Sequence, residues 1–334
     1  CVTADNHEFV RQVAIEALAS NFKDDPDIRS FLKDCVTADN HEFVRQVAIE
    51  ALASNFKDDP DIRSFLKDRA TADNSGDVQC AAIQALARNF KDDPDTRSIL
   101  KDRATADNSG DVQRAAIQAL ARNFKDDPDT RSILKDHTTA DNSGDVQRAA
   151  IQALARNFKD DPDTRLILKD HATADNHEDV RSAAIRALAT NFKDDSDTRS
   201  ILKDSTTDNS GNVRGAAIEA LASNFKDDPD TRSILKDRAT DNSGNVRRAA
   251  IEALGKFFRY QPELFEIYYN CAVNDPFERK QDYETNPRWV ALEIIIKQYP
   301  QHPQTVPLLR HKAENDPDEQ VRNFAQQKLA ELEK

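Results

Sequence analysis

The chain has 334 residues with 47 basic and 60 acidic side chains, which give a formal net charge of −13. Only 7 residues are glycine, 32% are charged, and no apolar run is long enough to span a bilayer, so the sequence argues against an integral membrane protein. The sequence pI of about 5.1 also argues against a generally basic nucleic-acid-binding domain. We expect a soluble, all-helical protein.

Almost the whole sequence consists of copies of one unit, which residues 103–136 represent. The copies start at intervals of 34 residues, at Cys1, Cys35, Arg69, Arg103, His137, His171 and Ser205, and the last starts 33 residues later, at Arg238. A fixed period of this length indicates stacked units that bury their apolar faces against their neighbours. Residues 1–34 and 35–68 are identical, so these copies can hardly hold distinct active sites.

Two helices are expected in each unit. Apolar residues recur at helical spacing through residues 111–124, which predicts an amphipathic helix. The next helix starts at Pro128, with Asp127 as its N-cap, and continues to about residue 140. Asp127 and Arg131 stand one helical turn apart and are expected to pair on its surface. The many alanines allow neighbouring helices to approach closely.

A loop aspartate followed shortly afterwards by a Val-Arg pair recurs along the chain. The pattern stands as Asp5, Val10 and Arg11; Asp39, Val44 and Arg45; Asp175, Val180 and Arg181; Asp208, Val213 and Arg214; and Asp241, Val246 and Arg247. It resembles the signature of HEAT repeats, in which the Val-Arg pair opens the second helix of each repeat. The resemblance implies an all-α fold, an α-solenoid (right-handed superhelix) of about ten stacked helix pairs. It also implies a hydrogen-bonded ladder between these aspartates and arginines of successive repeats.

Three central repeats depart from this pattern, because Gln79, Gln113 and Gln147 replace the arginine. A ladder built on glutamine is neutral on one side, so we expect weaker links between the central repeats.

The sequence divides into two parts according to how similar the repeats are to one another. Residues 1–258 are near-identical repeats of almost constant length, and residues 259–334 are two divergent copies with an inserted loop, residues 276–286. The spacing predicts ten second helices and nine first helices, the last pair being polar enough to cap the array. Because the first residues correspond to the end of a helix, we expect further repeats or another domain upstream of Cys1.

No catalytic constellation is present in the sequence. Cys1 and Cys35 occupy equivalent positions about 10 Å apart, beyond the reach of a disulfide, and His137 and His171 are related in the same way. No zinc spacing, Gly-rich phosphate loop or nucleophile elbow occurs. We therefore expect a non-catalytic, cytoplasmic protein without a cofactor or metal.

The first candidate surface is a basic and amide-rich stripe on the polar side of the central second helices. It comprises Arg88, Arg114, Gln118, Arg122, Arg148, Gln152, Arg156 and Arg186. The resemblance to HEAT arrays places these helices on a concave surface, where the stripe predicts a site for an acidic or extended protein partner. An ordinary solvated helix face is the alternative.

The second candidate surface lies at the divergent end. Trp289 takes a position that is polar in most copies, next to the inserted loop with Phe277 and Tyr283. The basic residues near it are Arg288, Arg248 and Lys256. A tryptophan beside arginine is typical of interface hot spots, so we expect Trp289 to be exposed. The alternative is a capping aromatic packed under the loop.

The favoured function is a scaffold that binds a protein or other ligand through its concave surface. Such self-similar arrays resemble the HEAT repeats in the C-terminal region of bacterial, notably cyanobacterial, NACHT-type signalling NTPases, which implies a sensing role in a larger signalling protein. One alternative is a protein similar to HEAT-like bilin lyases, with Cys80 on the concave face. The other is a HEAT-like nucleic-acid binder that uses the central arginines, which the acidic pI disfavours.

Overall fold

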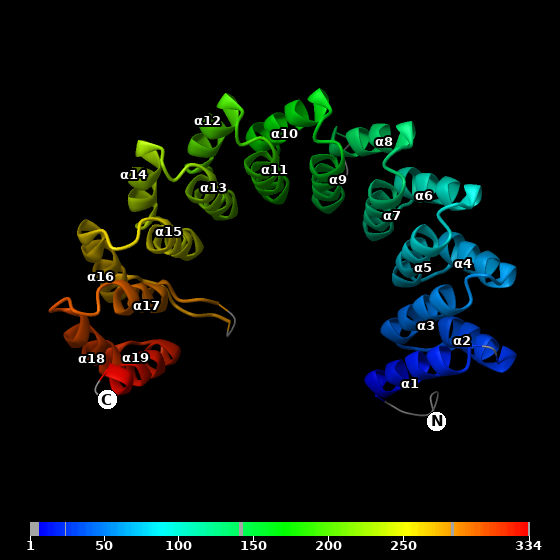
Figure 1. Cartoon of the computed structure of the whole chain (residues 1–334), viewed down its shortest axis with the longest axis horizontal. Coiled ribbons are helices and arrows are strands. Elements are labelled where there is room, and N and C mark those ends of the chain that lie inside the picture. Colours follow the sequence, from blue (N-terminus) through cyan, green and yellow to red (C-terminus); the bar gives the residue numbers. More distant parts are fainter. Residues whose placement is uncertain (1–6, 24, 140–142, 282–283, 333–334) are drawn as a thin grey trace. The chain divides into compact units, whose positions relative to one another are not determined.

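The structure, a computed structural model, describes residues 7–23, 25–139, 143–281 and 284–332. In these residues the chain forms 19 α-helices, one 3-10 turn and no strand (Figure 1). The all-α prediction and its ten second and nine first helices are confirmed. Two compact units divide the chain, residues 1–167 and 168–334. The predicted boundary at residue 258 reflects sequence copying and stays a prediction.

The odd-numbered helices are the second helices of the repeats, and the even-numbered helices are the first. Unit 1 contains α1 (Glu8–Asn21), α2 (Pro26–Ala38), α3 (Glu42–Asn55), α4 (Pro60–Ala72), α5 (Gly76–Asn89), α6 (Pro94–Ala106), α7 (Gly110–Asn123), α8 (Pro128–Thr139) and α9 (Gly144–Asn157). The division between the units falls within α10 (Pro162–Ala174).

Unit 2 continues the same alternation of helices. It contains α11 (Glu178–Asn191), α12 (Ser196–Ser205), α13 (Gly211–Asn224), α14 (Pro229–Arg238), α15 (Gly244–Phe257), the 3-10 turn η1 (Pro262–Leu264), α16 (Phe265–Asn274), α17 (Pro287–Gln298), α18 (Thr305–Asn315) and α19 (Glu319–Leu332). The inserted segment before α17 is a loop where the structure describes it.

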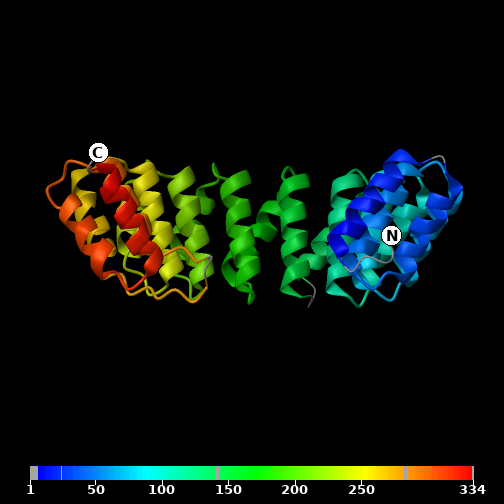
Figure 2. The ribbon, with the colours of Figure 1, turned by 90° about the horizontal axis from the view of Figure 1, so that it is seen from below.

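Each unit is built in two layers, with second helices side by side in one layer and first helices in the other (Figures 1 and 2). In α7 the apolar residues Val112, Ile117 and Leu120 are fully buried, as their helical spacing predicts. Ala115 and Ala119 are also buried, because successive second helices approach closely along alanines. The polar positions of the second helices are therefore left on the open side of their layer.

The first helices from α2 to α14 begin at an aspartate whose carboxylate accepts a hydrogen bond from the start of its own helix. The carboxylate of Asp127 accepts a hydrogen bond from the backbone N–H of Asp129 at 2.9 Å. We expected this carboxylate to pair with Arg131, but it does not. One of its oxygens lies 3.0 Å from the ammonium nitrogen of Lys101 in the preceding repeat. Arg131 instead reaches Asp161 of the following repeat at 3.4 Å. The expected pair within one helix is therefore wrong, and these charges link neighbouring repeats.

One lysine and two aspartates of the next repeat form each of these links, which we call lysine clamps. They are Lys67 with Asp93 and Asp95, Lys101 with Asp127 and Asp129, Lys135 with Asp161 and Asp163, Lys169 with Asp195 and Asp197, and Lys203 with Asp228 and Asp230. The clamps recur because the lysine and the capping aspartates recur in these consecutive copies of the unit.

The clamps shift the pKa values of both partners. Burial opposes ionisation of Asp127, but hydrogen bonds from Lys101 and from the backbone N–H of Asp129 outweigh it, so the pKa of this carboxyl lies below its usual value. The pKa of Lys101 is raised, chiefly by its hydrogen bond to Asp129. The carboxyl therefore contributes stability above its unfolded pKa, and that stability is lost as pH falls through the lowered folded value. The lysine contributes until pH rises through its raised value.

Asp127→Asn is expected to lower the free energy of unfolding at pH 7 by about 1 kcal/mol, because asparagine keeps the N-cap but loses the charge. The difference from the wild type should shrink as pH falls below about 4, because Asp127 is then protonated first in the unfolded chain and, at still lower pH, in the folded chain. Urea titrations at several pH values measure it, with Asp126→Asn as the matched control. Asp126 is exposed and has no ion pair among the described residues, so a loss of similar size in both variants would contradict the clamp.

Candidate functional site

A ladder of aspartate and arginine side chains links the repeats of unit 2, as the resemblance implies. Its rungs are Arg181 with Asp208, Arg214 with Asp241, Arg247 with Asp275 and Arg288 with Asp316. Each guanidinium also donates to a backbone carbonyl of the loop before its own helix, at 2.7 to 2.8 Å. Arg288 is 4% exposed, so it belongs to the ladder. Its place in a binding surface stays a prediction, and it also lines a groove with Phe277 and Arg279.

The repeats of unit 1 that carry glutamine in place of the ladder arginine keep the hydrogen bond to the backbone carbonyl. Gln79 donates to the backbone carbonyl of Asp73 at 2.8 Å, and Gln113 donates to that of Asp107 at 2.7 Å. The carboxylates of these aspartates are neutralised from within their own repeats, by Arg69 at 3.0 Å and by Arg103 at 3.1 Å. Both charges are therefore compensated within their own repeats. At the ladder position of the preceding repeat, Asp107 has Gln79, and Asp73 has Arg45, which donates to the hydroxyl of Ser75 at 3.2 Å instead. The expected contacts of Asp5 and Asp141 lie outside the described residues.

The stripe in unit 1 contains three exposed arginines at the same position of consecutive second helices. They are Arg88 on α5, Arg122 on α7 and Arg156 on α9. Within the described part of the chain, no carboxylate pairs with any of the three. We call this row the arginine row. It is a series of uncompensated positive charges in a chain that is acidic overall.

A groove of about 270 Å³ lies between α7 and α9 along this row. Gln118, Arg122, Gln152 and Arg156 line it, so the structure brings these four predicted residues together. Its floor consists of alanines, namely Ala121, Ala149 and Ala153. Most of its lining side chains are polar, which suits an extended chain better than a compact small molecule.

The remaining basic residues of the first candidate surface are already paired. Arg114 binds Asp111 at 2.6 Å and Arg148 binds Asp145 at 2.7 Å, each within its own helix. Arg186 belongs to unit 2 and binds Glu219 of the next repeat at 2.5 Å. These ion pairs reduce the charge available to a partner.

Trp289 is half-buried rather than largely exposed. Its ring packs edge-on against Phe324 of α19, with ring centroids 5.6 Å apart, and its indole N–H is buried. The expected exposure of Trp289 is therefore wrong, because α19 covers one side of the ring. Tyr283, the aromatic residue expected beside it, lies outside the described residues.

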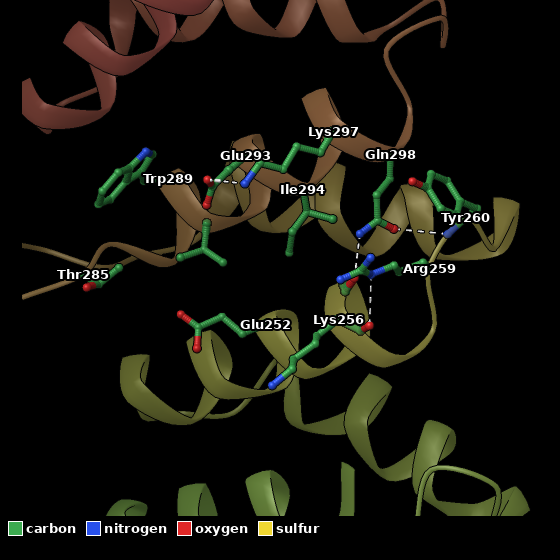
Figure 3. A pocket seen from close by; sticks show the side chains of 12 residues that line it. Glu252, Lys256, Arg259, Tyr260, Thr285, Trp289, Glu293, Ile294, Lys297 and Gln298 are labelled. Atoms are coloured by element: carbon green, nitrogen blue, oxygen red, sulfur yellow. Dashed lines mark hydrogen bonds and ion pairs between the residues drawn. The ribbon is translucent and has the colours of Figure 1, made fainter. Parts of the chain in front are cut away.

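The other side of Trp289 lines a groove of about 660 Å³ between α15 and α17 (Figure 3). Lys256 also lines this groove, and its ammonium lies 5.0 Å from the ring centre of Phe257. Arg248 is not among the lining residues and pairs with Glu252 at 2.8 Å. The structure thus brings Trp289 and Lys256 together and sets Arg248 and Arg288 aside.

Sequence reasoning missed the residues that shape this groove. They are Gly255, Arg259, Tyr260, Val290 and Ile294. A signal was present, since Gly255 and Ile294 replace alanines that the other near-identical copies share. Aligning the divergent copies position by position would have found it.

The described residues hold little that suggests chemistry. They contain no group of His, Cys, Asp and Glu that could hold a metal ion. Cys80, which favoured the bilin-lyase alternative, has its pKa raised to about 11, chiefly by burial. A thiol in that state is a weak nucleophile at neutral pH. Among the described residues, no helix is both long enough and apolar enough to cross a membrane.

Paired helices that stack only on their neighbours define an α-solenoid. A family model described as HEAT repeats matches residues 63–155 and 165–255, more than half of the chain, so the chain belongs to the HEAT-repeat family. No curated protein sequence matches the chain.

Solved structures share this fold at low sequence identity. The Escherichia coli protein YibA is 19% identical with a TM-score of 0.55, and the match covers 98% of this chain and 97% of YibA. Kap95p, solved in a study of its binding to RanGDP, is 14% identical with a TM-score of 0.60. That match covers 89% of this chain but only 44% of Kap95p. Both similarities concern the fold.

Proposed function

We propose that this chain is a non-catalytic scaffold that binds an acidic, extended segment of a partner protein through its second helices in unit 1. The observation that carries the proposal is the arginine row, three exposed guanidinium groups without carboxylate partners among the described residues of α5, α7 and α9 and their neighbours. The amides of Gln118 and Gln152 lie beside it and add neutral donors and acceptors.

The spacing of the row suggests what a partner segment looks like. Equivalent residues on neighbouring packed helices lie about 10 Å apart. An extended chain in the polyproline II conformation has three residues per turn and advances about 3.1 Å per residue, so acidic side chains at every third position lie on one side of it and match the row. Arginine binds carboxylates with two parallel hydrogen bonds, which favours it over lysine for such a contact.

The test uses a blocked, fluorescently labelled peptide of twelve residues with glutamate at every third position and serine and glycine elsewhere. Binding is measured by fluorescence anisotropy at low and moderate salt. Replacing Arg88, Arg122 and Arg156 together by glutamate is expected to weaken binding about 100-fold, roughly 2.7 kcal/mol, and binding to the wild type should weaken with salt. The variant should fold normally, because exposed positions rarely contribute more than about 0.5 kcal/mol each.

Matched control variants distinguish the loss of a specific site from the effect of the changed net charge. Lys91, Lys125 and Lys159 recur with the same period, are exposed and lack ion pairs within the described residues, so their replacement by glutamate imposes the same charge change elsewhere. Equal losses in both triple variants would contradict the arginine row. If a short DNA duplex binds more tightly than the peptide at moderate salt, the partner is a nucleic acid and the proposal of a protein partner is wrong.

We also propose that the scaffold is the sensing or interaction part of a larger, cytoplasmic signalling protein of the NACHT type. Its support is the resemblance of its near-identical repeats to the arrays of such proteins. The coding sequence upstream of Cys1 tests this proposal. A P-loop motif there would support it, and an unrelated open reading frame without one would contradict it.

A further inference from the structure

The groove between α15 and α17 is the enlarged counterpart of the groove between α7 and α9. Lys256 and Lys297 stand at the positions of Arg122 and Arg156, yet the volume is about 660 Å³ instead of about 270 Å³. The helix faces explain the difference. Where α9 presents Ala149 and Ala153 to its neighbour, α17 presents the larger side chains of Val290 and Ile294. Larger side chains at this contact keep the two helices further apart.

Gly255 accommodates the largest of these side chains. A Cβ at this position would lie 2.6 Å from Cδ1 and 2.8 Å from Cγ1 of Ile294, closer than carbon atoms can approach. The other seven near-identical copies carry alanine here, at Ala19, Ala53, Ala87, Ala121, Ala155, Ala189 and Ala222. The glycine thus allows Ile294 to settle into α15 and form an apolar floor. Trp289, held by Phe324, forms the wall at one end.

The opposite end of the groove is fixed by hydrogen bonds (Figure 3). The side-chain amide of Gln298 donates to the carbonyl of Gly255 at 2.6 Å, and its oxygen accepts from the backbone N–H of Tyr260 at 3.1 Å. Tyr260 has a positive φ of 58° and leaves its side chain 64% exposed. These hydrogen bonds therefore fix the shape of this end of the groove before any partner protein binds.

The charges of the groove are unbalanced toward positive. Its two carboxylates are neutralised, because Glu252 pairs with Arg248 at 2.8 Å and Glu293 pairs with Lys297 at 2.7 Å. Its other cations, Lys256 and Arg259, have no carboxylate partner among the residues that the structure describes. Two unpaired cations therefore lie beside an apolar floor.

We propose that this groove binds a peptide segment of a partner protein that carries a large aromatic side chain next to a carboxylate. The aromatic side chain packs on Ile294 and Val290 against Trp289, and the carboxylate pairs with Lys256 and Arg259. The site lies in unit 2 and shares no residue with the arginine row. It therefore stands or falls independently of the function proposed for unit 1.

The single tryptophan of the chain makes the test direct, because all tryptophan fluorescence comes from Trp289. The probe is a blocked hexapeptide, Gly-Ser-Phe-Glu-Ser-Gly, titrated into the full chain. Two control peptides replace its phenylalanine by alanine or its glutamate by glutamine. We expect a saturable change in emission with the probe and about tenfold weaker binding of each control peptide. Equal binding of all three peptides, or no saturable change, would overturn the proposal.

Two variants test the placement. Gly255→Ala combined with Ile294→Ala restores the alanine contact of the other repeats and should close the groove, weakening binding about tenfold or more. Lys256→Glu combined with Arg259→Glu should weaken binding of the glutamate probe similarly without altering the helix contact. Because the second variant changes only surface charge, it decides the question even where the first fails to fold.

The control for charge is Lys193→Glu combined with Lys226→Glu, which changes two exposed lysines of unit 2 that have no ion pairs in the described part of the chain. This control and the triple variant of the arginine row should both leave probe binding unchanged. Unchanged binding in the Lys256 and Arg259 variant would overturn the assignment of the carboxylate site. Loss of binding in the arginine-row variant would show that the probe binds elsewhere.

Discussion

Arg247→Gln is expected to lower the free energy of unfolding by about 3–5 kcal/mol, because it removes one partner of a buried ion pair. The guanidinium of Arg247 lies 2.6 and 2.7 Å from the two carboxylate oxygens of Asp275, whose side chain is 2% exposed. Without the arginine, Asp275 keeps a hydrogen bond from the backbone N–H of Phe277 but has no cation in its own helix. Cys271 stands where Arg69 and Arg103 stand in unit 1, so no replacement charge is at hand.

The chain supplies a matched control for this variant. Arg45 occupies the same position, but it donates to the carbonyl of Asp39 and to the hydroxyl of Ser75, and no carboxylate pairs with it among the described residues. Arg45→Gln should therefore lower the free energy of unfolding by no more than about 1 kcal/mol. Denaturant titrations of both variants, followed by circular dichroism, measure the contrast.

A double variant isolates the charge. Adding Asp275→Asn to Arg247→Gln removes the unpaired carboxylate and should recover a large part of the lost stability. A double variant as unstable as Arg247→Gln alone would show that packing of the guanidinium, and not its pairing, accounts for the loss. Equal losses in Arg45→Gln and Arg247→Gln would refute the difference between the two environments.

The sequence predicted the helices well, because helix-forming signals are local. In α7 the expected span of 111–124 is shifted only slightly from the observed Gly110–Asn123. α8 begins at Pro128 as expected, since a capping aspartate before proline leaves few other starts. Burial of the apolar residues followed directly from their spacing.

The partners of charged side chains were harder to predict, because repetition offers each charge several equivalent neighbours. Asp127 could pair with Arg131 one turn later or with Lys101 of the preceding repeat. The N-cap decided the matter, since a carboxylate that accepts from the N–H of Asp129 is already directed toward its own helix start. Such orientation depends on tertiary packing, which spacing alone does not specify.

The positions of the candidate residues were also predicted only in part, because they too depend on tertiary packing. The arginine row could be located because exposed positions repeat with the unit, and Arg122 and Arg156 do line one groove. Trp289 was misplaced because its exposure depends on α19, which belongs to the following repeat and begins only at Glu319. The α15–α17 groove depends on the fit of Gly255 to Ile294, which lie on helices of different repeats, so only the packed helices show it.

Leu120→Ala is expected to lower the free energy of unfolding by about 2–5 kcal/mol, because Leu120 is fully buried and its truncation leaves a cavity. The effect should be local. Helix α7 packs against α5, α6, α8 and α9, and contacts in such an array link near neighbours only. Hydrogen exchange should therefore lose protection first in α5 to α9, with α1 to α3 less affected.

Leu52→Ala provides the matched comparison, because Leu52 is the equivalent residue of α3 and is also fully buried. Helix α3 packs against α1, α2, α4 and α5, so the lost protection should shift toward these helices. Identical exchange maps for the two variants would mean that unit 1 unfolds as one cooperative block. A map that follows the substituted repeat would show that stability is local, so that a partner bound along α5, α7 and α9 would stabilise chiefly the repeats that it contacts.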